Sequence, residues 1–484
     1  DAFFSTPEMA LTSLETVSQI YGLAPGAEPV QVAPKAALGA AMLAVKEALS
    51  ETGGKVFVFS GGIPTAGPGA LERRGGGASG GEERERALLK DSNPFYESIG
   101  SELADLYIST DYFLATSSPY VDTATLMRMS RSCGGKNFYF PDYNVTVDSV
   151  AFQRCVIGAV RSVRAFEAMI KVRVSQGLET GEFLGNFGRP QRGDDVIAPV
   201  MDADSALAVE ITHAGRMAED GNGVRSGGPA SAAFNDAATQ CAVLYTDVHG
   251  RRRIRVHTVF AGKTTVLPDL FRSADVDAAL TLMAKRAAQA GLNASIPIVK
   301  IRDALVEKCT QALFIYRRFC TNQASPGQLI LPEALKLLPV YILGLLKSPG
   351  FRPIPTSSSS PEVVSSDERA AALIGLGSMT PAQTVAYSYP RMYSISEMPD
   401  IVGLPLPKNE QAMTQDIFRH MAELPEPTAL PATVALSSEK LEEGTVFMVD
   451  AGSRILVWIG ENVGTELIQD AFVVPAGATQ TLLL

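Results

Sequence analysis

The amino-acid sequence predicts a multidomain protein with an α/β part, an antiparallel β part and an all-helical part. Up to about residue 165, short apolar runs alternate with helical stretches. From Glu167 apolar residues recur with a period of two, and from Asp275 they recur at steps of three or four. These are the periods of a strand and of a helix. A chain of 484 residues has room for about three domains.

The first part, residues 1–165, has the pattern of a doubly wound parallel sheet. Continuous apolar runs of this kind are typical of strands buried on both faces. Strands are predicted at 55–60, 111–115 and 137–140. Helices are predicted at 36–49, 96–107 and 121–132. Between the first two strands, the Gly-rich residues 75–81 and the charged residues 82–86 predict a polar, mobile insertion.

The second part, residues 166–262, has the alternating pattern of an antiparallel β-sandwich. Ile170, Val172 and Val174 alternate with polar residues. The runs 243–245 and 254–256 flank a turn at 247–250, which predicts a hairpin. A long loop is expected between residues 214 and 235, where Gly and Ala are frequent.

A helical domain is predicted at residues 263–366. Asp275 is suited to cap a helix that Gly291 ends. One apolar stripe then runs along the next helix, through Ile298, Ile301, Leu305, Cys309, Leu313, Tyr316 and Cys320.

Residues 367–400 and 401–484 are predicted to form the last two parts. Thr384–Tyr389 is predicted as a strand that returns to the β-sandwich. Residues 401–484 would comprise a linker and a further module with strands at 444–450 and 454–460.

Composition excludes some classes of protein. The net charge of −10 argues against a nucleic-acid binder, which usually carries a basic stripe. The five cysteines are scattered without a CxxC pair, which favours buried thiols in a reducing compartment over disulfides or a zinc site. No signal peptide is visible, and the chain opens at Asp1, so a fragment of a longer protein is expected.

No motif predicts catalysis, a cofactor or a metal. There is no GxGxxG after a strand, no phosphate-loop lysine, no HExxH and no GxSxG. The four histidines lie in strand, turn or loop contexts. Asn93-Pro-Phe95 matches a short endocytic ligand motif but directly precedes a predicted helix. Ser-His-Asp chemistry is independent of spacing, so an α/β enzyme with a cleft in the first domain stays open as an alternative.

The stretch from Leu329 to Leu346 is mostly apolar and has three interpretations. A membrane span is disfavoured by Glu333, Lys336 and two prolines, since a span needs about 20 nearly uncharged residues. A buried amphipathic helix is the simpler interpretation. The third, a surface that grips a peptide, depends on the resemblance described below.

Arg251, Arg252, Arg253 and Arg255 form the sharpest charge feature. Alternation in a strand would place Arg253 and Arg255 on one face, with Ile254 and Val256 on the other. The arginines would either form a solvated strand face or contact an anionic membrane surface or an acidic partner.

Several motifs, taken in order, resemble the cargo-adaptor subunit of the COPII vesicle coat, the Sec-twenty-four family. They cover residues 30 to 470 approximately. In the α/β and β parts they are Tyr120-Val-Asp-Thr-Ala-Thr-Leu126, Lys171-Val-Arg-Val with Gly177, Phe183-Leu-Gly-Asn-Phe187, Leu244-Tyr-Thr246 and Arg252-Arg-Ile-Arg-Val-His257. In the helical part they are Met283-Ala-Lys285, Ile301-Arg-Asp-Ala-Leu305, Gly327-Gln-Leu-Ile-Leu-Pro-Glu333 and Lys336-Leu-Leu-Pro-Val-Tyr341.

This resemblance implies a von Willebrand A-like trunk, a β-sandwich, an all-helical domain, a strand returning to the sandwich and a gelsolin-like module. The trunk is expected to be incomplete at its start, and the gelsolin-like module to be cut short after Gly477. The family's zinc finger would lie ahead of the trunk, outside this sequence. No cofactor is therefore expected within these residues.

The resemblance also implies a function and partners. The subgroup with Leu-Ile-Leu in the helical motif binds Ile-x-Met transport signals of SNARE proteins, which points to Leu329, Ile330 and Leu331. The implied protein is a non-enzymatic adaptor for cargo and SNARE sorting peptides. It would pair with its paralogous inner-coat subunit and be recruited by a Sar-type small GTPase to endoplasmic reticulum exit sites, as a cytoplasmic, peripheral membrane protein. The alternative within the family is that paralogue, which stimulates GTP hydrolysis with an inserted arginine.

Overall fold

The computed structural model describes residues 9, 12, 15, 36–74, 81–189, 195–215, 236–294, 296–321, 328–353, 364–396, 398–405, 428–452 and 454–467. The chain divides into two compact units. The first comprises Asp1–Ala274, Leu282–Ala334 and Leu346–Thr380. The second comprises Asp275–Thr281, Leu335–Leu345 and Pro381–Leu484.

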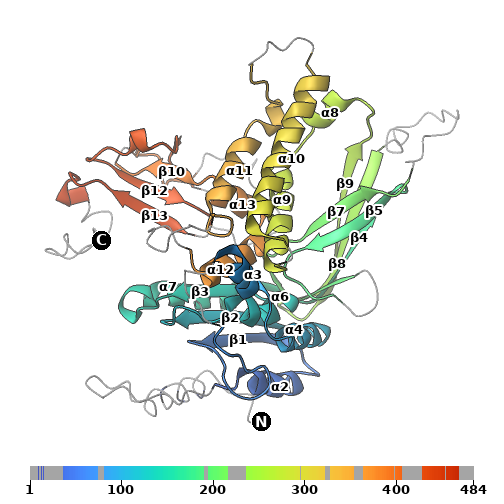
Figure 1. Ribbon diagram of the computed structural model, residues 1–484, viewed down its shortest axis with the longest axis vertical. Coiled ribbons are helices and arrows are strands. Elements are labelled where there is room, and N and C mark those ends of the chain that lie inside the picture. The colour runs from blue at the N-terminus through green and yellow to red at the C-terminus, as the bar shows by residue number, and fades with distance from the viewer. Residues whose placement is uncertain are drawn as a thin grey trace. The chain divides into compact units, whose positions relative to one another are not determined.

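A parallel sheet of order β1-β2-β3 lies at the start of the first unit (Figure 1). Its strands are β1 (Gly54–Ser60), β2 (Ile108–Thr116) and β3 (Asn137–Pro141). The helices are α2 (Leu38–Ala48), α4 (Phe95–Asp105), α5 (Thr123–Leu126), α6 (Arg128–Ser132) and α7 (Val145–Arg161). The predicted strands and helices are therefore present in the predicted order, while α7 was not anticipated.

Strand β2 is the centre of this α/β core. Helices α4 and α6 pack on it, and Tyr112, Phe113 and Leu114 are fully buried. The ring of Phe113 stacks on Phe138 of β3, with centroids 4.5 Å apart. Phe152 of α7 completes the aromatic cluster, at 5.9 Å from Phe113. Burial on both faces explains why β2 is a continuous apolar run in the sequence.

The β part of the first unit consists of a four-stranded sheet of order β6-β4-β8-β9 and a two-stranded sheet, β5-β7. The strands are β4 (Val163–Val174), β5 (Leu178–Leu184), β6 (Val196–Asp202), β7 (Ala208–His213), β8 (Asp236–Asp247) and β9 (Arg252–Gly262). All described pairings are antiparallel. The predicted hairpin is confirmed, because Leu244 faces Ile254 across the β8–β9 pair. Most of the predicted loop at 214–235 lies outside the described residues.

The predicted polar insertion is wrong for residues 82–86. They form α3 (Gly81–Leu89), whose last turn buries Leu88 and Leu89. Glu85 of this helix accepts a hydrogen bond from the buried Arg369, with Nε 2.6 Å from Oε1. Good helix formers followed by two leucines thus fold onto the protein despite their charge. Residues 75–80 lie outside the described part of the chain.

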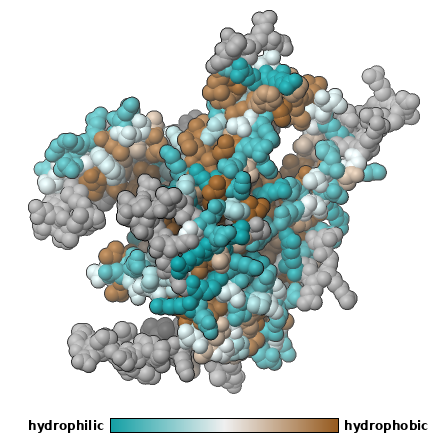
Figure 2. All heavy atoms as spheres, viewed as in Figure 1, coloured by the Kyte–Doolittle hydropathy of each residue, from teal (hydrophilic) through white to brown (hydrophobic). Residues whose placement is uncertain are grey.

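The helical part contributes α8 (Leu267–Arg272), α10 (Ile298–Phe319), α12 (Ser366–Ser378) and the later residues of α9 (Val276–Leu292) to the first unit. The apolar stripe of α10 is confirmed in its first half, where Ile301, Leu305 and Cys309 are buried. Towards its end Phe314 and Phe319 are exposed, and apolar side chains gather there in Figure 2. All five cysteines are free, and two of them are buried.

Helix α12 is joined to the α/β part by two buried charged residues. The Asp367 carboxylate accepts hydrogen bonds from the backbone amides of Val121 and Thr123, both at 2.7 Å. Arg369 donates to the carbonyls of Pro349, Gly350 and Arg352. The two bonds of Asp367 give the Tyr120–Leu126 motif a structural role, because the backbone of the motif is the partner of α12.

In the second unit, the predicted strand at Thr384–Tyr389 is wrong. Residues Pro381–Ser388 form α13. The strand that follows, β10 (Arg391–Ser394), joins β11 (Thr433–Val434), β12 (Val446–Asp450) and β13 (Ile455–Ile459) in an antiparallel sheet of order β11-β10-β12-β13. It therefore does not return to the described strands of the β-sandwich.

Close backbone packing explains α13. Its terminal residue Ser388 approaches α11 (Leu338–Lys347), where a Cβ built on Gly344 would lie only 1.8 Å from the Ser388 carbonyl oxygen. Thr384 and Ala386 are buried in this packing. Tertiary contacts thus override the strand that the local sequence suggests at 384–389. The two strands predicted at 444–450 and 454–460 are confirmed as β12 and β13.

Candidate functional site

The predicted cargo-binding residues Leu329, Ile330 and Leu331 lie in a segment without regular secondary structure. Residues 328–332 are followed by a 3-10 turn, Glu333–Leu335, and then by α11. The proline at 332 removes a backbone donor, which is consistent with the helix beginning only later. The amphipathic-helix interpretation therefore holds for α11 and not for the Leu-Ile-Leu residues.

These three residues are more exposed than residues of a hydrophobic core. The Leu329 side chain is 77 % exposed, and Ile330 and Leu331 are half-buried. An exposed leucine beside two partly buried aliphatic residues leaves apolar area that a peptide can cover. Among the described residues, no helix is both long and apolar enough to cross a membrane.

Three of the four predicted arginines already have acidic partners. Arg251 and Arg253 both donate from Nε to Oδ2 of Asp247, at 3.0 and 2.6 Å. Desolvation raises the pKa of Asp247, but hydrogen bonds from the Arg251 amide and from Arg253 outweigh it and lower that pKa overall. Arg252 donates to the Glu167 carbonyl at 3.0 Å and to its carboxylate at 3.3 Å.

Arg255 is different, since its guanidinium makes no hydrogen bond or ion pair with any residue that the structure describes. It lies on β9, which is the last strand of its sheet and is exposed along its whole length. Opposite it in β8 lies Val243, and Tyr245 lies opposite Arg253. The two arginines therefore share a face, as predicted, and Ile254 and Val256 on the other face are also exposed.

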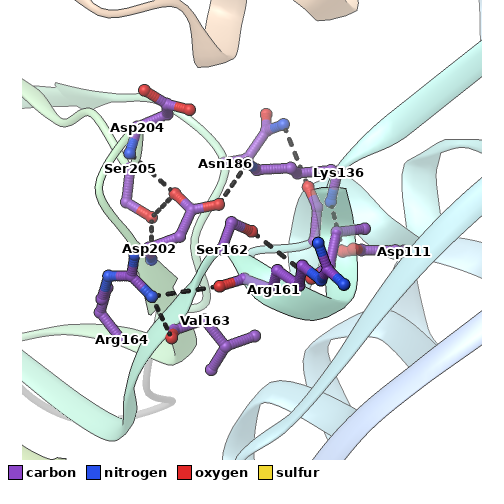
Figure 3. Close-up of polar contacts among 12 residues, drawn as sticks. Asp111, Lys136, Arg161, Ser162, Val163, Arg164, Asn186, Asp202, Asp204 and Ser205 are labelled. Carbon is purple, nitrogen blue, oxygen red and sulfur yellow. Dashed lines mark hydrogen bonds and ion pairs between the residues drawn. The ribbon is translucent and has the colours of Figure 1, made fainter. Parts of the chain in front are cut away.

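A set of polar contacts joins the α/β and β parts beside the Phe183–Phe187 motif (Figure 3). The Lys136 ammonium forms an ion pair with Asp202, and its backbone amide donates to Asp111 at 2.9 Å. Burial raises the pKa of Asp202, but the ion pair with Lys136, together with hydrogen bonds from Ser205 and the Asp204 amide, outweighs it and lowers that pKa overall. The Asn186 amide reaches the Gly135 carbonyl at 3.5 Å. The loop after β5 is thereby held against the α/β part.

The backbone conformation at position 185 in this loop requires glycine. Its φ is +147°, and an added Cβ would lie 2.9 Å from the Ala206 carbonyl oxygen. A residue with a side chain would be strained there and would collide with backbone.

The structure also brings together cationic side chains that the sequence reasoning did not associate. Arg131, Arg189 and Lys285 come from three distant segments and line one cavity. Two of the motifs quoted above, 183–187 and 283–285, are adjacent to it or contribute to it. No pattern of spacing could have revealed the cavity, because its walls are far apart in the sequence. Among the described residues there is no group of three or more His, Cys, Asp or Glu side chains placed to hold a metal ion.

Four family models match successive parts of the chain. They are the Sec23/Sec24 trunk domain (residues 11–157), the Sec23/Sec24 beta-sandwich domain (165–262), the Sec23/Sec24 helical domain (275–386) and a gelsolin repeat (427–476). Their order agrees with the predicted order of domains. The helical-domain model continues to residue 386, past the boundary predicted at 366.

Similar proteins agree with these models. The chain is 31 % identical over 449 residues to "Protein transport protein SEC24 B" of Arabidopsis thaliana, covering 92 % of this chain and 36 % of that protein. It is also 31 % identical over 434 residues to human "Protein transport protein Sec24C", covering 90 % and 35 %. The crystal structure of the human COPII-coat protein Sec24c is similar with a TM-score of 0.76 and 28 % identity, covering 97 % of this chain and 56 % of that one. The chain thus spans little more than a third of the length of these two relatives.

Proposed function

The chain belongs to the Sec23/Sec24 family, with its trunk, β-sandwich, helical and gelsolin-like parts, and on that premise we propose that it is a cargo-adaptor subunit of the COPII coat. Its function would be to bind short cytosolic sorting signals on cargo, including SNARE proteins, so that the cargo is exported from the endoplasmic reticulum to the Golgi. The relatives reported above carry the name Sec24 rather than that of the GTPase-activating paralogue, which favours the adaptor.

The proposed function does not involve catalysis. We propose a non-enzymatic protein without a cofactor within these residues, in agreement with relatives that are named as transport proteins. Its partners would be the paralogous inner-coat subunit, a Sar-type small GTPase and an anionic membrane surface, at endoplasmic reticulum exit sites. Weak binding at each signal would be strengthened by avidity in the assembled coat.

The observation that carries the cargo proposal is the exposure of Leu329 beside Ile330 and Leu331. Covering these aliphatic side chains with the two apolar residues of an Ile-x-Met peptide would contribute about 1.5–3 kcal/mol for each fully buried side chain, before the cost of ordering the peptide. Such a site suits reversible capture.

A fluorescent Ile-x-Met peptide tests this proposal in a titration monitored by anisotropy. We expect saturable binding that becomes roughly tenfold to a hundredfold weaker in the triple variant Leu329→Ala/Ile330→Ala/Leu331→Ala, because its apolar contacts are lost. Leu270→Ala, which removes another exposed leucine on α8, is the control and should bind normally. Circular dichroism verifies that the variants are folded. Equal binding by a folded triple variant would place the peptide elsewhere.

We also propose that Arg255 leads the contact with an anionic surface, together with Arg251, Arg252 and Arg253. Its lack of a partner among the described residues supports this order. Arg251, Arg252 and Arg253 are held by Asp247 and Glu167, so their charges are partly compensated.

A further inference from the structure

A cavity of about 320 Å³ lies within the first unit, where its α/β, β and helical parts meet. Its walls come from α4, α6, the loop after β5, α9 and α12. Its charged and polar lining side chains include Arg128, Arg131, Asn186, Arg189, Lys285 and Gln289. The volume is at the lower end of the range for pockets that take small ligands.

Positive charge dominates the lining. It includes three arginines and one lysine but only one carboxylate, that of Glu97. Glu97 is already used, because it pairs with Arg128, as does Asp91 at 3.4 Å. Arg131 is attracted by Asp91 and Glu97 but forms no ion pair with either, and Arg189 and Lys285 have no carboxylate partner among the lining residues.

Arg131 is the central group. Its side chain is half-buried, and its guanidinium makes no hydrogen bond or ion pair with any described residue. Burial, and then the nearby charge of Arg128, lower the pKa of Arg131 to about 10, although the charges of Asp91 and Glu97 oppose this shift. A cation that is partly withdrawn from water and has no ion-pair partner would be stabilised by a bound anion.

The other two cations are held in place by neutral groups. Arg189 donates from Nη2 to the Phe183 carbonyl at 2.9 Å, and its guanidinium lies over the Phe187 ring. Lys285 donates from Nζ to the Gly377 carbonyl at 2.7 Å. Carbonyl oxygens orient these side chains without cancelling their charge, so they are positioned for a further acceptor.

The neutral amides of the lining are already used as donors, so recognition of a ligand depends on the cationic groups. The amides of Asn186 and Gln289 are held by Gly135 and Glu182, respectively. Planar guanidinium groups match the oxygens of a carboxylate or a phosphate in bidentate fashion.

We infer that this cavity is a binding site for a small oxyanion, a carboxylate or a phosphate group, received by Arg131 with Arg189 and Lys285 beside it. The site is separate from Leu329–Leu331 and from Arg251–Arg255, and the inference does not depend on the proposed function. Residues from three structural parts would contact one ligand, so binding would also hold these parts together.

Isothermal titration calorimetry with the 484-residue chain tests the inference at pH 7. The probes are inorganic phosphate and the dicarboxylate glutarate, each against sodium chloride at matched ionic strength. We expect saturable binding of at least one probe, at least tenfold weaker in Arg131→Gln, because the charge-assisted hydrogen bonds of the guanidinium are lost. Phosphate alone or glutarate alone would identify which oxyanion the site accepts.

Two further variants keep the test decisive. Arg189 is exposed, so Arg189→Gln should fold normally and also weaken binding, which covers the case that Arg131→Gln does not fold. Arg164→Gln is the matched control, because among the described residues that arginine bonds only to the carbonyls of Arg161 and Val163, outside the cavity (Figure 3). Absence of saturable binding of both probes overturns the inference. So does binding that survives in Arg189→Gln and in a folded Arg131→Gln.

Discussion

At the scale of single residues, Lys285 makes the most specific prediction about stability. Its side chain is 2 % exposed, and burial lowers its pKa to about 8 from the ordinary 10.5. Between these two values the unfolded chain still binds the proton that the folded chain has released. The free energy of unfolding therefore rises with pH across this window, by up to about 3 kcal/mol.

Comparison with Lys285→Met isolates this effect. Methionine removes the titrating group, so the wild-type chain should gain stability relative to the variant as pH rises from 8 to 10.5. The measurement is the urea concentration at the unfolding midpoint at several pH values. Lys300→Met, which removes an exposed lysine from α10, should follow the wild type. If the difference in stability between the wild type and Lys285→Met stays constant with pH, Lys285 does not titrate in this range.

The arginines show how far single residues can be read from sequence. Alternation along β9 correctly placed Arg253 and Arg255 on one face. It could not show that Asp247, just before the turn, accepts from both Arg251 and Arg253. Nor could it show that Glu167, about 85 residues earlier, reaches Arg252. Only the fold decides which charges are compensated, and of these four arginines it leaves Arg255 without a partner among the described residues.

At the scale of elements, β9 is an exposed edge strand, and the contact with an anionic surface that we propose for it can be tested. We expect the chain to float with vesicles that contain phosphatidylserine and not with vesicles of phosphatidylcholine alone. Arg255→Gln should weaken this binding about fivefold, since each arginine near the surface contributes about 1 kcal/mol. Arg252→Gln should weaken it less, because Glu167 already pairs with that side chain.

The vesicle experiment also separates lipid from protein as the anionic surface. Binding to a polyglutamate peptide, but not to the anionic vesicles, would assign β9 to an acidic protein partner. Equal flotation of the wild type and Arg255→Gln would show that Arg255 plays no part in membrane contact. Arg164→Gln serves as the control for the loss of one surface arginine.

Elements also show where sequence patterns fail. Strand β2 and the first half of α10 were predicted because burial imposes a clear period on their residues. Residues 381–388 and 81–89 were not, because a short segment with few apolar positions fits either a helix or another structure. Contacts with distant segments decide these cases: α13 packs closely against Gly344, and α3 provides Glu85 to Arg369.

At the scale of the whole molecule, the ion pair between Lys136 and Asp202 tests how the α/β and β parts support each other (Figure 3). The Asp202 side chain is 4 % exposed, so Lys136→Met leaves a poorly solvated charge. We expect a loss of about 2 kcal/mol at pH 7, less than for a fully buried pair because Lys136 is partly exposed. Lys171→Met breaks a more exposed pair, with Asp195, and should cost less.

The pKa of Asp202 determines how the stability lost in Lys136→Met changes with pH. Lys136 lowers the pKa of Asp202 in the folded protein, so the stabilisation is present above the unfolded pKa of about 3.9 and disappears as pH falls below it. The difference between the wild type and Lys136→Met should therefore shrink between pH 5 and pH 2. Thermal unfolding over this range gives the answer, and a difference independent of pH would mean that the pair contributes nothing.

The sequence by itself determined the classes of structure along the chain and their order. Hydrophobic period is a local property, set by which face of each helix or strand is buried, so it survives in the sequence without knowledge of the neighbours. The ordered motifs added the family, which the four family models support.

The tertiary structure alone decided which side chains meet. It placed β10 in the sheet with β12, left Leu329 exposed, and gathered Arg131, Arg189 and Lys285 around one cavity. Each of these outcomes depends on contacts between residues far apart in the chain. Their free energies arise from burial and charge in three dimensions, and no short window of the sequence contains them.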